Sequence, residues 1–194
     1  MVKFKCTLCG VCCSQYWVPV THLDAWRMVN YGGYDARDFL VLYKSSSYKS
    51  TFPKVLLWED EGYLGLKRFT DGFCVFNRNK ICTVHQFKPL TCRFYPFIYV
   101  TSNGRITGIE VNKNAVKVCP GLIYDNNSID VETRSSLIQL AEIRIVERNL
   151  YARAVKEWSS EYCGRGLFKE FVDFLVEKAE VDAKTLIRRG LWIK

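Results

Sequence analysis

The sequence predicts an α+β fold, with a small N-terminal region organised by its cysteines, two β-hairpins and short helices, followed by a C-terminal helical bundle. Two observations support this prediction. Eight of the nine cysteines lie within the first 119 residues, and only the last third of the chain has a sustained helical spacing of apolar residues. A length of 194 residues is enough for one substantial core. We therefore expect residues 1–125 and 126–194 to pack as one compact unit.

Two short helices are expected after the first cysteine cluster. Residues 20–29 read as a helix, because Thr21 and Asp24 have the spacing of a capping box. The glycine pair at 32–33 ends this helix. Residues 35–43 are predicted as a second helix, followed by a serine loop at 45–47.

Two β-hairpins come next. Residues 54–58 and 63–69 flank an acidic turn at 59–62 and form the first. The second joins 97–101 to 105–111 through an Asn-Gly pair, the strongest short-range signal for a two-residue turn.

The last third of the chain is predicted to be helical. Residues 132–158 carry a broad apolar stripe among alternating Glu and Arg, which indicates one long amphipathic helix. A second helix begins at Phe168, and a third, shorter one runs from Asp182 to Gly190. We expect these apolar stripes to form core contacts.

The sequence also predicts the compartment. No apolar run approaches the roughly 18 residues that a membrane-spanning helix needs, and the longest, at 95–100, has six. The start of the chain lacks the apolar stretch of a secretory signal, so we expect a cytoplasmic protein with no membrane partner. A reducing cytosol favours metal binding or catalysis over disulfides for clustered cysteines.

The first cluster is the stretch CTLCGVCC, which begins at Cys6. Two overlapping C-x2-C pairs let sulfurs meet on one metal within a tight loop, and Gly10 tolerates the positive φ of such loops. The triple spacing also matches the opening of bacterial ferredoxin loops. Cys12 and Cys13 are adjacent, and in extended backbone their side chains point opposite ways. Each would then serve a different metal, or one would be a non-ligating thiol.

The later cysteines are spread more widely, as Cys74, Cys82, Cys92 and a Cys-Pro at Cys119. His85 follows Cys82 at a metal-ligand spacing, although a surface histidine is the simpler interpretation. His22, within the first helix, and Cys163, in the last third, are expected to be structural and incidental respectively.

Five elements occur in a fixed order and resemble the CxxCxxCC family of zinc- or iron-chelating, cysteine-cluster proteins. They are C-x-x-C-G-x-C-C, Cys-x-Phe, Cys-x-x-His, Lys-Pro-Leu-Thr-Cys-Arg-Phe-Tyr-Pro-Phe and Cys-Pro-Gly, between residues 6 and 121. Lys88 departs from the family, which usually has Arg there. The resemblance implies a metal site, and not a particular reaction, held by Cys6, Cys9, Cys12, Cys13, Cys74, Cys82, Cys92 and Cys119.

Eight thiolates exceed one four-coordinate site. They suit two Cys₄ zinc sites, one [4Fe–4S] cluster with a second centre, or one cluster with spare thiols. The triple C-x2-C-x2-C loop and the remote Cys-Pro favour an iron–sulfur cluster over Zn²⁺, with redox or electron transfer as a consequence. Arg93, directly after Cys92, is a candidate cofactor-binding cation that offsets cluster charge or binds an anionic substrate. The alternative for Arg93 is a salt bridge.

The formal net charge of +8 invites a nucleic-acid interpretation, but it counts every cysteine as neutral. Four thiolates around a +2 ion or cluster core contribute −2, so one site gives +6 and two sites give +4. A zinc-stabilised module that binds RNA or a ribonucleoprotein is the second hypothesis. Its candidate residues are Arg134, Arg144, Arg148, Arg153, Lys156, Arg188 and Arg189. Glu147 and Glu157 interrupt this surface, which favours an ordinary solvated face.

A third hypothesis is modification of a protein or nucleic acid, and it rests only on the flagellin lysine methylases that carry a related domain. The chain has no dinucleotide-binding, P-loop, zinc-protease or serine-hydrolase motif. Any enzyme chemistry would therefore come from the metal.

Overall fold

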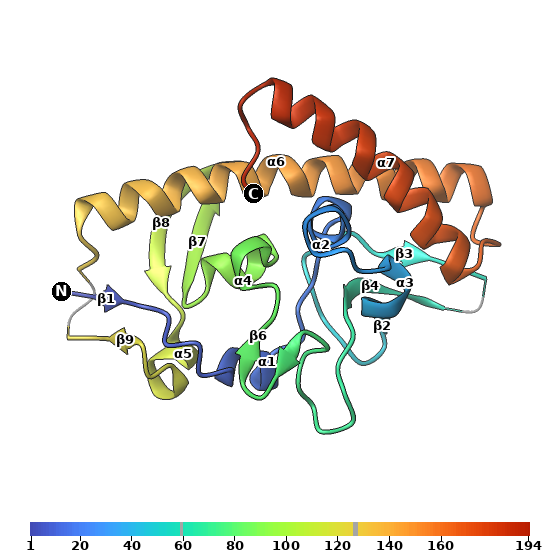
Figure 1. Cartoon of the computed structure of the whole chain (residues 1–194). Helices are drawn as coiled ribbons and strands as arrows, with labels where there is room; N and C mark the ends of the chain where they lie inside the picture. The colour runs from blue at the N-terminus through green and yellow to red at the C-terminus, as the bar shows by residue number, and fades with distance from the viewer. Residues whose placement is uncertain (59, 126–127) are drawn as a thin grey trace.

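The computed structural model describes residues 1–58, 60–125 and 128–194. Helix accounts for 46% and strand for 20% of the structure, and the strands form several small antiparallel sheets, which confirms the α+β prediction. Figure 1 shows the long helix α6 (Val131–Tyr162) running across the molecule. The shorter elements lie below α6 in this view, and α7 (Phe168–Arg188) crosses it.

The remaining elements are short. In chain order they are β1 (Lys3–Phe4), α1 (Val11–Gln15), α2 (His22–Gly32), α3 (Ala36–Phe39), β2 (Leu40–Lys44), β3 (Val55–Leu56), β4 (Glu61–Leu66), β5 (Asn77–Arg78), β6 (Ile81–Cys82), the 3₁₀ turn η1 (His85–Phe87), α4 (Leu90–Phe94), β7 (Phe97–Ser102), β8 (Arg105–Val111), α5 (Lys113–Val118) and β9 (Leu122–Ile123).

Helix α2 begins and ends as its sequence predicts. The Thr21 hydroxyl accepts a hydrogen bond from Asp24 N at 3.2 Å, and the Asp24 carboxylate accepts one from Thr21 N at 3.0 Å. Gly33 ends the helix with a φ of 69°. The capping box is therefore confirmed.

The predicted helix over residues 35–43 is only half correct. Asp35 caps the short α3, but the chain then extends as β2 and pairs antiparallel with β4. Leu40–Lys44 is a run of apolar and aromatic residues that suits a half-buried strand, and pairing with β4 overrides its weak helical pattern.

Both predicted hairpins form. β3 and β4 pair antiparallel and complete a three-stranded sheet in the order β2-β4-β3. The predicted turn at 59–62 is placed too late, because Glu61 and Gly62 already belong to β4, and Glu59 lies outside the described residues. β7 and β8 pair around Asn103 and Gly104, both of which have positive φ. The small β5–β6 hairpin was not predicted.

The C-terminal region contains two helices where the sequence predicts three. α7 continues through Asp182 to Arg188, so the predicted start at Asp182 is wrong. The Asp182 carboxylate does not cap a new helix but lies 2.9 Å from Nε2 of His22 on α2. This contact holds α7 against α2, and His22 is structural, as expected.

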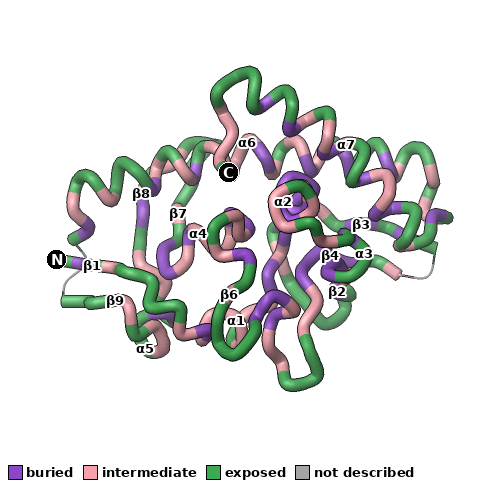
Figure 2. The backbone as a smooth tube through the Cα atoms, in the orientation of Figure 1, coloured by how far each residue is buried: buried purple, intermediate pink, exposed green. Residues whose placement is uncertain are grey.

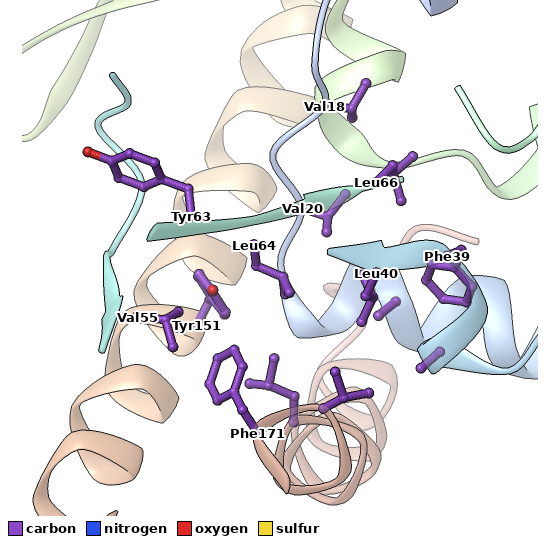
Figure 3. Packing of buried hydrophobic residues seen from close by; sticks show 14 of the residues in the cluster. Val18, Val20, Phe39, Leu40, Val55, Tyr63, Leu64, Leu66, Tyr151 and Phe171 are labelled. Carbon is purple, nitrogen blue, oxygen red and sulfur yellow. The ribbon is translucent and has the colours of Figure 1, made fainter. Parts of the chain in front are cut away.

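The main apolar core lies where the sheet, α2, α6 and α7 meet (Figure 3). Tyr151 from α6 and Phe171 from α7 face Leu40 and Leu64 of the sheet, and all four are buried. A second cluster packs β7 and β8 against the first turns of α6, and it includes Phe97, Ile109 and Ala141. Figure 2 marks buried residues in purple, and they include residues on α2, α6 and β8, which contribute to these clusters. Because α6 contributes to both, we propose that residues 1–125 and 126–194 fold as one unit.

A buried ion pair fastens α2 to α6. The guanidinium of Arg27 donates to both carboxylate oxygens of Glu147, once at 3.0 Å, and neither side chain is exposed. Arg27 Nε also donates to the Ile193 carbonyl at 2.7 Å, and the guanidinium lies over the Trp192 ring. In the described parts of the chain, no helix is both long and apolar enough to cross a membrane.

Candidate metal centre

A single cavity of about 310 Å³ contains all eight cysteines of the predicted site in its wall. These are Cys6, Cys9, Cys12, Cys13, Cys74, Cys82, Cys92 and Cys119. They come from five separated segments of the chain. Cys163 lies elsewhere, exposed at the C-terminal end of α6.

The pairing of β1 with β9 brings the two ends of the cysteine region together. Lys5 N donates to the Gly121 carbonyl at 3.0 Å, which places Cys6 beside the Cys119 segment. A Cβ at Gly121 would lie 2.1 Å from the Lys5 carbonyl oxygen. The glycine of the Cys-Pro-Gly element is therefore needed for this close backbone approach.

The CTLCGVCC loop packs on the β5–β6 hairpin. Gly10 has a φ of 71° and precedes α1, and a Cβ there would lie 2.8 Å from Asn77 Nδ2. The Cys13 carbonyl accepts a hydrogen bond from Cys74 N at 2.9 Å. These contacts place the first cluster beside Cys74 and Cys82.

Helix α4 carries Cys92 and is fixed from its N-terminus. The Asp24 carboxylate, already part of the α2 cap, accepts a hydrogen bond from Leu90 N at 2.8 Å. Figure 1 shows α4 between α6 and the α1–β6 region. One carboxylate thus connects the core helices to the segment that presents Cys92.

Electrostatic interactions divide the thiols into two groups. We call Cys12, Cys13, Cys74, Cys82 and Cys92 the inner group, because each interacts with others of this set. We call Cys6, Cys9 and Cys119 the outer group, since Cys119 interacts with the other two. Cys82 and Cys6 connect the two groups.

Burial opposes ionisation of most inner thiols. Burial raises the pKa of Cys74 to about 12 and that of Cys92 well above its ordinary value, and neighbouring cysteines raise both further. Lys88 acts in the opposite direction on Cys92. Such thiols become thiolates together only when a cation compensates their charge, and a bound metal supplies that cation.

Cys12 and Cys13 both line the cavity because they lie in helix α1. Neighbouring helical side chains diverge by about 100° instead of the roughly 180° of extended backbone, so the expectation that they point opposite ways was wrong. The Cys12 thiol donates to Cys13, which lowers the pKa of Cys13 to about 6 and raises that of Cys12.

The thiols line the cavity, but their sulfur atoms are not arranged around a common centre. Within residues 1–58, 60–125 and 128–194, no three Cys, His, Asp or Glu side chains are close enough to hold one metal ion as they stand. Coordination therefore requires the thiols to turn inward around a ligand. A thiol-rich, mostly apolar wall suits metals that bind soft thiolates, zinc and iron–sulfur clusters among them.

Arg93 does not line the cavity. Its guanidinium donates to the carbonyls of Lys88 at 2.9 Å and Gln86 at 3.2 Å. It thereby supports the segment that presents Lys88 and His85, both of which do line the cavity. Burial and the nearby Lys88 lower the pKa of His85, so its imidazole is neutral at pH 7.

The cationic residue from α6 that lines the cavity is Arg144, which the sequence placed only among candidate RNA contacts. Arg144 lies on the same helical stripe as the buried Leu137, Ala141 and Tyr151. A charge on an apolar stripe is the signal that could have identified it. Arg148, another of those RNA candidates, instead donates to the Thr51 carbonyl.

Comparisons with known proteins agree with the cysteine pattern. Residues 5–120 match the model of the CxxCxxCC family, whose description is "Putative zinc- or iron-chelating domain". The chain is also similar to the uncharacterized protein MJ0661 of Methanocaldococcus jannaschii, with 24% identity over 136 residues. That match covers 68% of this chain and 64% of the relative. No solved structure matches the chain.

Proposed function

This chain belongs to the CxxCxxCC family of zinc- or iron-chelating domains, and from that premise we propose that its cysteine cavity binds an iron–sulfur cluster. The observation that carries the proposal is that thiols from five separated segments line one cavity. When bound, such a cluster supplies electron transfer or an iron that accepts a ligand. Electron transfer in the cytoplasm is the role that we infer.

The inner group favours a cluster over a single zinc ion. It holds five thiols, and a [4Fe–4S] cluster takes four cysteine ligands, so the inner group by itself can hold the cluster. Lys88 faces this group and offsets part of the negative charge that thiolates bring. We propose that four of the inner thiols are cluster ligands, and that Cys6, Cys9 and Cys119 bind a second ion or remain free.

Zinc is the second candidate, and the outer group supports it. Three cysteines complemented by one histidine form a common structural zinc site, and the neutral His85 lies in the wall of the same cavity. In that case the protein would be a zinc-stabilised module, and its chemistry would not be redox.

Metal analysis of anaerobically purified protein distinguishes the two. We expect a brown protein with iron and sulfide in equal amounts. Cys92→Ser should lose most of the iron, because Cys92 interacts with three other inner thiols. Cys163→Ser is the matched control, since Cys163 is exposed and outside the cavity, and it should retain the metal. A colourless wild-type protein that contains only zinc would refute the iron–sulfur assignment.

A further inference from the structure

We propose that the cysteine cavity also binds a small organic anion, with a carboxylate or phosphate head held by Arg144 and Tyr95 and an apolar body against the cavity wall. The inference concerns the same cavity as the proposed metal centre but rests on groups that are not thiols. It would hold for either metal.

Arg144 reaches the cavity with part of its guanidinium unused. Nη2 donates to the Thr91 hydroxyl at 3.2 Å, and that hydroxyl donates onward to the Pro19 carbonyl at 3.0 Å. Nε is buried without a hydrogen-bond partner. The Arg144 guanidinium lies 5.4 Å from the centroid of the Tyr99 ring. Among the described residues no carboxylate forms a salt bridge with this guanidinium, in contrast to Arg27, which Glu147 pairs with two hydrogen bonds. A desolvated cation in this state favours an anionic partner.

Tyr95 provides a second unused donor in the same wall. Its hydroxyl is buried without a hydrogen-bond partner, and its ring packs against Tyr16 with the centroids 5.7 Å apart. Burial raises the pKa of Tyr95, so the phenol keeps its proton at neutral pH. Arg144 and Tyr95 both line the cavity, and each has one buried donor that can reach an acceptor oxygen of a ligand once its side chain turns toward the cavity.

Lys88 is a second cation in the cavity wall, and it lies near the thiols. Lys88 interacts with Cys12, Cys13, Cys82 and Cys92. Arg144 interacts with Cys92 and lies in the cavity wall beside the thiols, where it can contact a ligand.

The cavity has the size and lining for an organic body. The whole cavity is about 310 Å³, at the lower end of the roughly 300–1,000 Å³ range of small-molecule pockets, and the metal centre fills part of it, so the organic body must be small. Phe4, Leu8, Trp17 and Ile98 contribute apolar wall. An apolar wall with a few fixed donors is the usual pattern of a specific small-molecule site.

The test uses the full chain, purified anaerobically with its metal, and calorimetric titration at constant ionic strength. Sodium benzoate and phenyl phosphate are the two anionic probes, and benzyl alcohol is the neutral comparator. We expect saturable binding of at least one anion and none of the alcohol. The better-binding anion identifies the head group.

Two variants and one control separate this site from the metal centre. Arg144→Met and Tyr95→Phe should each keep the wild-type metal content, and Arg144→Met should bind the anion roughly tenfold or more weakly. Arg148→Met, one turn along α6, should bind as wild type because Arg148 contacts Thr51 and Phe52 and not the cavity. Failure of both anions to saturate, or wild-type affinity in both cavity variants, would overturn the proposal and leave the metal assignment untouched.

Discussion

The most direct perturbation of the cysteine region is Gly121→Ala, because this substitution disrupts the backbone contact between Lys5 and Gly121 that joins the two ends of the region. The added Cβ would lie 2.1 Å from the Lys5 carbonyl oxygen, and that oxygen is backbone that cannot rotate away. An ordinary carbon–oxygen contact needs roughly 3.3 Å or more. β1 and β9 must therefore separate by about 1 Å.

The cost follows from two contributions. Overpacking of a close contact destabilises proteins by about 1–3 kcal/mol. The hydrogen bond from Lys5 N to the Gly121 carbonyl, 3.0 Å long, would weaken or break, which adds about 0.5–1.5 kcal/mol. We expect a loss of about 1.5–4.5 kcal/mol in the free energy of unfolding, a large share of the roughly 5–15 kcal/mol that stabilises a typical domain.

Urea denaturation under anaerobic conditions measures this loss, and metal analysis accompanies it. Gly108→Ala is the control, because Gly108 lies in strand β8, which is also antiparallel-paired, and a Cβ there meets nothing within 4 Å. We expect Gly121→Ala to lose stability and outer-group metal while Gly108→Ala resembles wild type. If both variants unfold at the same urea concentration as wild type, the reasoning about this backbone approach is wrong.

Two further predictions concern the core and the pH dependence. Glu147→Gln removes one of two negative partners of the fully buried Arg27, the other being Asp24 at 3.5 Å, and should lower the free energy of unfolding by about 1.5–3 kcal/mol; a variant as stable as wild type in urea would contradict this. The Trp26 indole donates to Glu180 and lowers the pKa of that carboxylate below 4.5. This stabilisation is present above pH 4.5 and is lost as the pH falls through the lower, folded-state pKa. Glu180→Gln should therefore flatten the acid limb of a stability–pH profile, and an unchanged limb would refute the assignment.

Local signals account for the elements that were predicted correctly. The capping box of α2 involves residues three positions apart, and the turn of the β7–β8 hairpin needs only two residues with positive φ. Such signals act within one turn of backbone, so they can be read without knowing the partners of the element. The long helix α6 is similar, because its apolar stripe repeats along its own sequence.

The predictions fail where the conformation or position of a residue depends on segments that are far away in sequence. Leu40–Lys44 becomes a strand because β4 pairs with it, and Asp182 lies inside α7, where its carboxylate contacts His22 of α2. Arg93 follows Cys92 in sequence but donates to the Lys88 and Gln86 carbonyls outside the cavity wall, whereas Arg144 lines the cavity and its side chain reaches Thr91 of α4. Adjacency in sequence was the wrong guide to adjacency in space.

The spacing and order of the cysteines by themselves determined the family of this protein, its chelating chemistry and the residue types of its site. The reason is that the ligand spacing of a metal-binding loop is contained in a few consecutive residues. Only the tertiary structure decided that all eight thiols face one cavity and how they divide into inner and outer groups. It also placed Arg144 and Tyr95 in that wall. The physical reason is that these placements depend on close packing between distant segments, above all β1 against β9 and α6 against α4, whose energies no local pattern encodes.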